Sequence, residues 1–169
     1  DRAEWFGQHL RLANALDMSQ VILCDKGLPE LGDDAKPRID VWWRGLDNGS
    51  LMVLLAHLLT GNWEWRRAKI RLLHLSAEDE DLDAAEQSIK ALMEAARLEG
   101  EVLIIPSGTS NVVESIHEHS HDADVVVLGF KPPADDDAAR SFHQFYASVV
   151  EGLPTTLLIN SSGDVDLLS

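Results

Sequence analysis

The sequence predicts a doubly wound α/β fold, in which helices cover both faces of a mostly parallel β-sheet. Between residues 39 and 169, short apolar runs alternate with longer amphipathic segments about five times. The runs are rich in β-branched residues, which favour strands, and most connections between elements are short and marked by Gly, Pro, Asn or Asp. Parallel strands require crossover connections, and the amphipathic segments supply them as helices.

The strand expected at the centre of this sheet is 39–43, Ile-Asp-Val-Trp-Trp. Successive side chains of a strand point to opposite faces, so one face cannot bury both Trp42 and Trp43. We therefore expect this strand to be covered on both sides, as in the interior of a parallel sheet. A polar turn follows, which can cap a helix over about 50–60 and comprises Asp47, Asn48, Gly49 and Ser50.

The other elements of this unit follow in regular alternation. A helix over about 80–98 carries an amphipathic stripe, and the segment from Ser76 to Asp79 has the composition of a helix cap. Further helices are expected over about 110–119 and from Asp135 to about Gly152. The remaining strands are expected at 70–75, 102–106, 125–130 and 156–159.

The first part of the chain, a helix over 3–16 and a strand at 21–24, is similar to the helix and strand that close it. The two units share an early aromatic residue and an apolar strand position, at Phe6 and Phe142 and at Ile22 and Leu158. Such an internal repeat predicts that the chain starts within an earlier, similar domain. The predicted organisation is 1–27 as the last helix and strand of a preceding half-domain, 28–38 as a linker, and 39–169 as a second α/β half-domain.

A single helix and strand cannot bury their own apolar faces, so the first unit must pack against the main sheet or a second chain. We expect strand 21–24 to pair antiparallel with strand 156–159 at the edge of the sheet. The interface residues predicted from this pairing are Val21, Ile22, Leu23, Leu157, Leu158 and Ile159.

Composition argues against several classes of partner. The formal net charge is −15, and the densest basic cluster, 66–71, runs directly into a predicted strand, so we expect no nucleic-acid partner. No apolar run reaches the length of about 18 residues needed to cross a bilayer, so we expect no direct insertion of this segment into a membrane. The single Cys24 cannot form an internal disulfide, which favours a reducing compartment.

The best-placed candidate site lies where two predicted strands end. The ligand-binding residues considered there are Asp47, Asn48, Gly49, Ser50, Gly129 and Lys131. Open α/β sheets bind ligands beyond the carboxyl ends of their strands, with helix amides facing an anion. The turn lacks the glycine spacing of a phosphate-binding loop, and Pro132 and Pro133 remove amide donors. A helix-capping turn is therefore the favoured interpretation, and nucleotide binding is the alternative.

Other polar clusters have simpler explanations than catalysis. His117 and His121 would share a helix face, as in a metal site, but they lie at a helix end, which suits histidine. The acidic runs 78–81 and 135–137 lie near helix starts and lack the spacing of a calcium loop. We predict no catalytic residue, metal or cofactor, and keep a metal-dependent enzyme as a third possibility. Trp63 and Trp65 are either core residues or part of a docking surface.

The block 39–43, followed by 47–49 and 51–59, resembles a signature of the cytosolic C-terminal domain of the cation-chloride cotransporters. Further stretches resemble that domain in the same order, namely 65–72, 97–102, 121–128 with Pro132 and Pro133, 145–152, 157–159 and 166–169. Two features depart from the family. Asn48-Gly49-Ser50 stands where Asp-Gly-Gly is usual, and the phosphorylatable insert between the third and fourth strands is short.

This resemblance implies a non-catalytic regulatory and dimerisation domain at the cytoplasmic face of the cell membrane. The family's domain consists of two similar α/β halves related to the universal stress protein fold, below a transporter that couples chloride with sodium or potassium. The implied partners are the chain's own transmembrane transport domain, a first cytosolic half-domain and a second copy in a homodimer. The alternative is a universal-stress-protein-like nucleotide-binding module.

Overall fold

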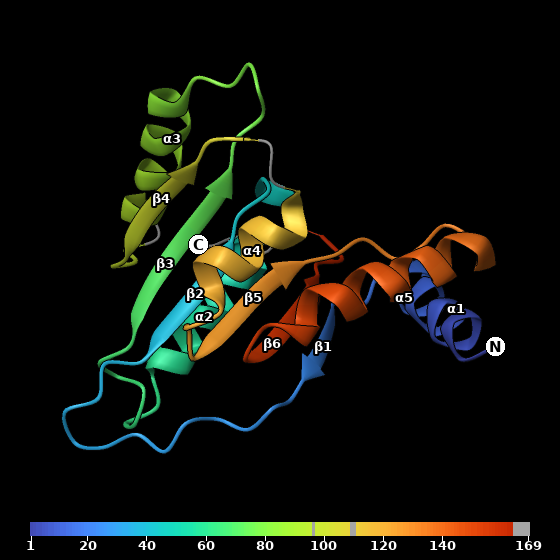
Figure 1. Cartoon of the computed structure of the whole chain (residues 1–169), viewed down its shortest axis with the longest axis horizontal. Coiled ribbons are helices and arrows are strands. Elements are labelled where there is room, and N and C mark those ends of the chain that lie inside the picture. Colours follow the sequence, from blue (N-terminus) through green and yellow to red (C-terminus); the bar gives the residue numbers. More distant parts are fainter. Residues whose placement is uncertain (96, 109–110, 164–169) are drawn as a thin grey trace.

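The computed structural model describes residues 1–95, 97–108 and 111–163, and within them the chain forms one mixed sheet with helices on both faces (Figure 1). The strands are β1 (Gln20–Cys24), β2 (Arg38–Trp42), β3 (Lys69–Leu75), β4 (Glu101–Ile105), β5 (Val125–Gly129) and β6 (Thr155–Asn160). The helices are α1 (Arg2–Ala15), α2 (Leu46–Thr60), α3 (Leu82–Ala95), α4 (Val112–Ser120) and α5 (Asp136–Glu151).

The strand order is β1-β6-β5-β2-β3-β4, and every neighbouring pair is parallel except β1 with β6. The chain starts the parallel sheet at β2, adds β3 and β4 on one side, and then returns to add β5 and β6 on the other. The order therefore reverses between β2 and β5, which makes this junction the switch point of a doubly wound sheet. The predicted fold class is confirmed, and so is the central place of the tryptophan strand.

The two adjacent tryptophans are buried in different layers, as predicted. Trp43 belongs to the core that α2 and α3 close, whereas Trp42 belongs to the core that α1, α4 and α5 close. In Figure 1, α4 and α5 lie in front of the sheet and α2 lies behind it. Each face of β2 is therefore covered by its own helical layer.

The first helix and strand join the same sheet. β1 pairs antiparallel with β6 at the edge, which confirms the predicted pairing, and α1 packs against α5. Ile22 lies directly opposite Leu158, the residue with which it aligns in sequence. The two helix–strand units are thus arranged as an approximate two-fold pair. The division of the chain into half-domains stays a prediction.

The buried carboxylate of Asp40 joins three elements. Its side chain is 0% exposed, and it accepts hydrogen bonds from Arg71 Nε at 2.8 Å and Arg71 Nη2 at 2.7 Å. Ser120 Oγ, at the end of α4, donates to the same carboxylate at 2.7 Å. Trp42 Nε1 donates to Ser120 Oγ at 3.0 Å. This network fixes α4 over β2 and β3.

The start of α2 differs from the prediction. Residues 47–50 were expected to form a turn before the helix, but they form its first turns, because α2 begins at Leu46. The change of direction occurs instead at Gly45, whose φ of +102° favours glycine. Gly49 is helical and lies against Trp43, where an added Cβ would come within 2.2 Å of the ring. Close packing of α2 on Trp43 thus outweighs the turn preference of these residues.

The predicted cap of the third helix is also wrong. Ser76 is buried and its amide donates to the carbonyl of Ile105, so it extends the pairing of β3 with β4. α3 begins later, and Asp81 Oδ1 accepts from the amides at 83 and 84. Glu80 instead accepts from His74 Nε2 at 3.0 Å, and this hydrogen bond lowers the pKa of Glu80.

Asp135 caps α5 by accepting from the amide of residue 138, as its position predicted.

We expect Asp40→Asn to lower the free energy of unfolding by about 3–5 kcal/mol, because the substitution leaves the Arg71 guanidinium without its buried counter-ion. The measurement is urea unfolding followed by circular dichroism. Glu86→Gln is the matched control, since Glu86 pairs with Lys90 on the exposed face of α3. That variant should change stability by less than about 0.5 kcal/mol. Equal effects of the two substitutions would contradict a stabilising role for the buried network.

Candidate functional site

Two adjoining cavities lie at the carboxyl ends of β2 and β5, at the switch point of the sheet. The polar cavity has a volume of about 480 Å³ and lies between the start of α2 and the residues that follow β5. The apolar cavity has a volume of about 260 Å³ and lies between the end of β2, α4 and α5. The residues that border both cavities are Trp42, Arg44, Gly129 and Tyr146.

Most of the predicted ligand-binding residues come together in the polar cavity. Asp47, Asn48, Gly49, Gly129 and Lys131 line it, whereas Ser50 is not among its lining residues. β2 and β5 are parallel neighbours, so the segments that follow them meet at one edge of the sheet. The structure therefore brings five of the six predicted residues together, and their binding role stays a prediction.

Asn48 has a structural role that its turn-like sequence context did not indicate. Its Nδ2 donates to the carbonyl of Phe130 at 2.9 Å, and its Oδ1 accepts from the amide of Ser161 at 2.8 Å. One side chain therefore ties α2 to the ends of β5 and β6. Both Nδ2 and Oδ1 of Asn48 are thus hydrogen-bonded within the protein. We therefore assign Asn48 a structural role in the wall of the polar cavity and not a role in binding a ligand.

The charges at the rim of the polar cavity are partly matched within the protein. Lys131 Nζ lies 3.4 Å from Asp47 Oδ2, and both side chains are exposed. Among the described residues, no side chain caps the N-terminus of α2. The first amides of a helix favour an anion, but the carboxylate of Asp47 beside them opposes a second negative charge. Arg44 is the cation that borders both cavities.

Tyr146 contributes to the site from α5, and no sequence pattern assigned it there. Its hydroxyl donates to the carbonyl of Gly129 at 2.9 Å, which anchors α5 to the end of β5. Burial raises the pKa of Tyr146 to about 12, and the positive charge of Arg44 acts in the opposite direction. Arg44 is exposed and follows the tryptophan strand, where nothing in its immediate sequence distinguishes it from an ordinary surface residue.

The walls of the apolar cavity come from elements that are distant in sequence. Leu128 at the end of β5 forms part of its floor, and Ile116 of α4 and Val149 of α5 form facing sides. Phe145 and Val112 are partly exposed and lie at its rim. The lining residues come from β2, β3, α4, β5 and α5, so no local sequence pattern encodes the cavity.

The histidines considered as metal ligands are occupied by backbone carbonyls. His117 Nε2 donates to the carbonyl of Val149 at 2.7 Å, which links α4 to α5. His121 Nδ1 donates to the carbonyl of His117 at 3.0 Å. In the part of the chain that the structure describes, no group of three or more His, Cys, Asp or Glu side chains is placed to hold a metal ion.

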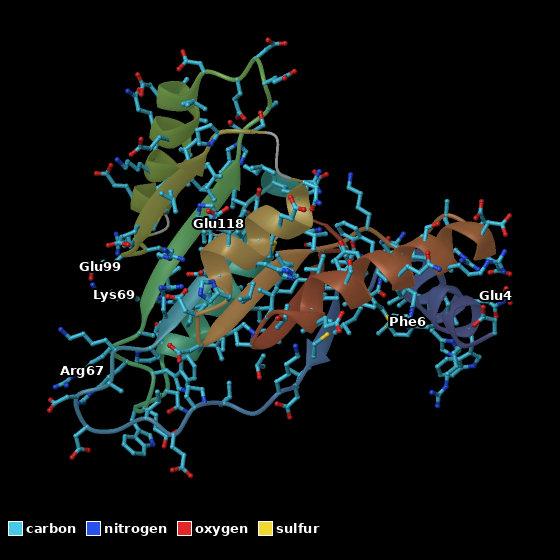
Figure 2. All side chains as sticks on the ribbon, in the orientation of Figure 1. Glu4, Phe6, Arg67, Lys69, Glu99 and Glu118 are labelled. Carbon is cyan, nitrogen blue, oxygen red and sulfur yellow. The ribbon has the colours of Figure 1, made fainter. Side chains whose placement is uncertain are left out.

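The two tryptophans outside the central strand have different environments. Trp65 is buried in the core behind the sheet, whereas Trp63 is 75% exposed. Arg67 and Lys69, from the basic cluster, lie at the amino end of β3, far from the α1–α5 pair (Figure 2). Both cavities lie at the carboxyl ends of the parallel strands, so these two residues lie at the opposite end of the sheet. Among the described residues, no helix combines the length and apolar character needed to cross a bilayer.

Tyr146 provides a direct test of the geometry of the site, because it is the only tyrosine in the chain. Its pKa of about 12 in the folded protein exceeds the ordinary value of 10.0. Between these values the unfolded chain loses the phenolic proton while the folded chain keeps it, so stability falls as the pH rises through this window. We expect an ultraviolet titration to show tyrosinate above pH 11 while the circular dichroism stays native. Ionisation near pH 10 with a native spectrum would contradict the buried position.

Comparison with solved structures supports the fold. The chain is similar to the crystal structure of the cytoplasmic domain of a prokaryotic cation chloride cotransporter, with a TM-score of 0.68 and 22% sequence identity. The alignment covers 99% of this chain and 62% of that chain, so this protein spans less than two thirds of the solved domain. No curated protein matches the sequence.

Family membership follows from the sequence itself. The family model described as solute carrier family 12 matches residues 32–122, which is more than half of the chain. The matched region contains the tryptophan strand β2, all of α2 and the segment up to the end of α4. The match confirms the family to which the tryptophan block pointed, and the chain belongs to solute carrier family 12.

Proposed function

We propose that this chain is part of the cytosolic regulatory and dimerisation domain of a cation-chloride cotransporter-like membrane transporter. Membership of solute carrier family 12 supports a transporter as the parent protein. The fold is similar to a structure described as the cytoplasmic domain of a prokaryotic cation chloride cotransporter, which supports a place at the cytoplasmic face of the membrane. The chain acts by packing against partners and has no catalytic function.

The observation that carries this proposal is the uncovered apolar face of β1. Val21 and Leu23 are 51% and 59% exposed, although they lie in a strand. Their cross-strand partners on β6 are Ile159 and Leu157, which belong to the core that α2 covers. The same face thus continues past β6 onto β1 without a helical layer. An exposed edge strand with apolar side chains is a surface that proteins normally cover.

The partner that fits this face is the first cytosolic half-domain. α1–β1 and α5–β6 form an approximate two-fold pair, and a helix equivalent to α2 in a preceding half would cover Val21 and Leu23 as α2 covers the β6 residues opposite them. The solved domain is longer than this chain, which leaves room for such a half. α1 adds exposed Trp5 and Leu12, and Leu16 follows at its C-cap. This surface is suited to the transport domain or to a second copy.

The test introduces two charges on β1 in the full-length transporter, as Val21→Glu with Leu23→Glu. We expect chloride uptake and the dimer fraction each to fall at least about fivefold, because a buried unpaired carboxylate opposes the packing. The measurements are chloride uptake in cells and mass photometry of the purified transporter. Leu82→Glu is the control, since Leu82 is 38% exposed at the start of α3, which packs on β4 at the opposite edge of the sheet from β1. Unchanged uptake and stoichiometry in the double variant would refute the proposal.

A nucleotide-binding module is the second candidate function. The polar cavity favours it, because this cavity lies at the switch point beside the uncapped start of α2. Two features oppose it, namely the carboxylate of Asp47 near those amides and the prolines at 132 and 133, which lack amide donors.

Calorimetry with ATP and magnesium distinguishes the two functions. We expect no binding with a Kd below about 1 mM, because the strand ends lack a phosphate cradle. A lower Kd, abolished by Lys131→Gln and retained by the remote variant Lys90→Gln, would establish the nucleotide-binding function instead. Lys90 is a suitable control because it lies on the exposed face of α3 and pairs with Glu86.

A further inference from the structure

We propose that the apolar cavity is a binding site for a small aromatic or aliphatic carboxylate, whose hydrocarbon part enters between α4 and α5 and whose charge pairs with Arg44. The site is separate from the β1 face, so its existence does not depend on the proposed interface. It also differs from the nucleotide alternative, which would use the polar cavity and the start of α2.

The walls of the cavity set the character of the ligand body. Ile116, Leu128 and Val149 are buried around it, and the rings of Trp42 and Phe145 border it. The volume of about 260 Å³ lies just below the range of drug-sized pockets, so the ligand has roughly ten non-hydrogen atoms. A planar ring or a short branched chain fits such walls.

The polar groups of the walls are already used within the protein. Trp42 Nε1 donates to Ser120, and the Tyr146 hydroxyl donates to the carbonyl of Gly129. Ser76 Oγ donates to the carbonyl of Ile105. A polar ligand body would leave its own hydrogen-bonding groups unmatched in this cavity, which is costly. The cavity therefore selects an apolar body.

Arg44 selects the charge of the ligand. It borders both cavities, and no ion pair of the described residues includes it. Tyr146 and Phe145 line the apolar cavity together with Arg44, so the cation and the aromatic rings border the same space. A guanidinium pairs well with a planar carboxylate. In a protein of net charge −15, a single negative charge is also repelled less than a polyanion.

The experiment uses the whole chain, labelled with ¹⁵N, and 3-phenylpropionate as the probe. We expect binding with a Kd on the order of 0.1–1 mM, with shifts of the Trp42 indole NH and of amides near residues 116 and 149. The uncharged amide of the same probe should bind about tenfold more weakly, as should the carboxylate to the variant Arg44→Gln. These losses isolate the contribution of the charge pair.

Two further variants separate the cavities. Val112→Phe places a ring at the rim of the apolar cavity, where Val112 is already partly exposed, and should abolish binding in a chain that still folds. Lys131→Gln alters only the polar cavity and should leave the affinity unchanged. Equal affinity for the amide probe, loss of binding in Lys131→Gln, displacement by ATP with magnesium, or no shifts at about 10 mM probe would each overturn the proposal.

Discussion

The buried charge of Asp40 is the constraint on which the rest of the fold depends. A carboxylate inside a protein is tolerated only when its charge and its lone pairs are matched. Here the partners come from separate elements, since Arg71 lies on β3 and Ser120 lies at the end of α4. The neighbour of the central strand and the position of one covering helix are thus specified together. Hydrophobic burial alone, which is not directional, would leave both less determined.

The two tryptophans contact the helical layers on the two faces of the sheet and so help to position both. Trp42 donates a hydrogen bond to the same Ser120, which holds α4 over the end of β2. The apolar cavity lies next to this contact, between α4 and α5. Trp43 points the other way and is so close to Gly49 that any larger residue there would displace α2. The start of α2, and with it the polar cavity, is therefore positioned by packing against one ring.

Most of the fold could be predicted because the signals are local. Apolar runs and amphipathic stripes located the strands and helices, and the alternation of Trp42 and Trp43 located the central strand. The start of α2 could not be predicted, because residues 47–50 favour a turn in isolation, whereas in the structure they are helical and Gly49 packs closely on Trp43. The prediction of the α3 cap was wrong for a similar reason, since the pairing of Ser76 with β4 is a long-range interaction.

The candidate site was predictable only in part. Asp47 and Lys131 could be named as candidates because each follows the carboxyl end of a predicted strand. That the two strands are parallel neighbours, and so bring these residues together, is known only from the sheet topology. Arg44 and Tyr146 required the packing of α5 across the sheet, which sequence spacing does not reveal. A residue far along the chain can be assigned to a site only when the helix that carries it has been docked.

α5 connects the two surfaces that the proposals use. At one end Ala139 lies against Gly7 of α1, where an added Cβ would come within 2.6 Å, and Arg11 of α1 pairs with Asp136. At its other end Val149 lines the apolar cavity. Such close packing leaves little space for one helix to shift without the other. A ligand in the cavity can therefore affect the β1 edge only if its affinity differs between two placements of α5 relative to the sheet.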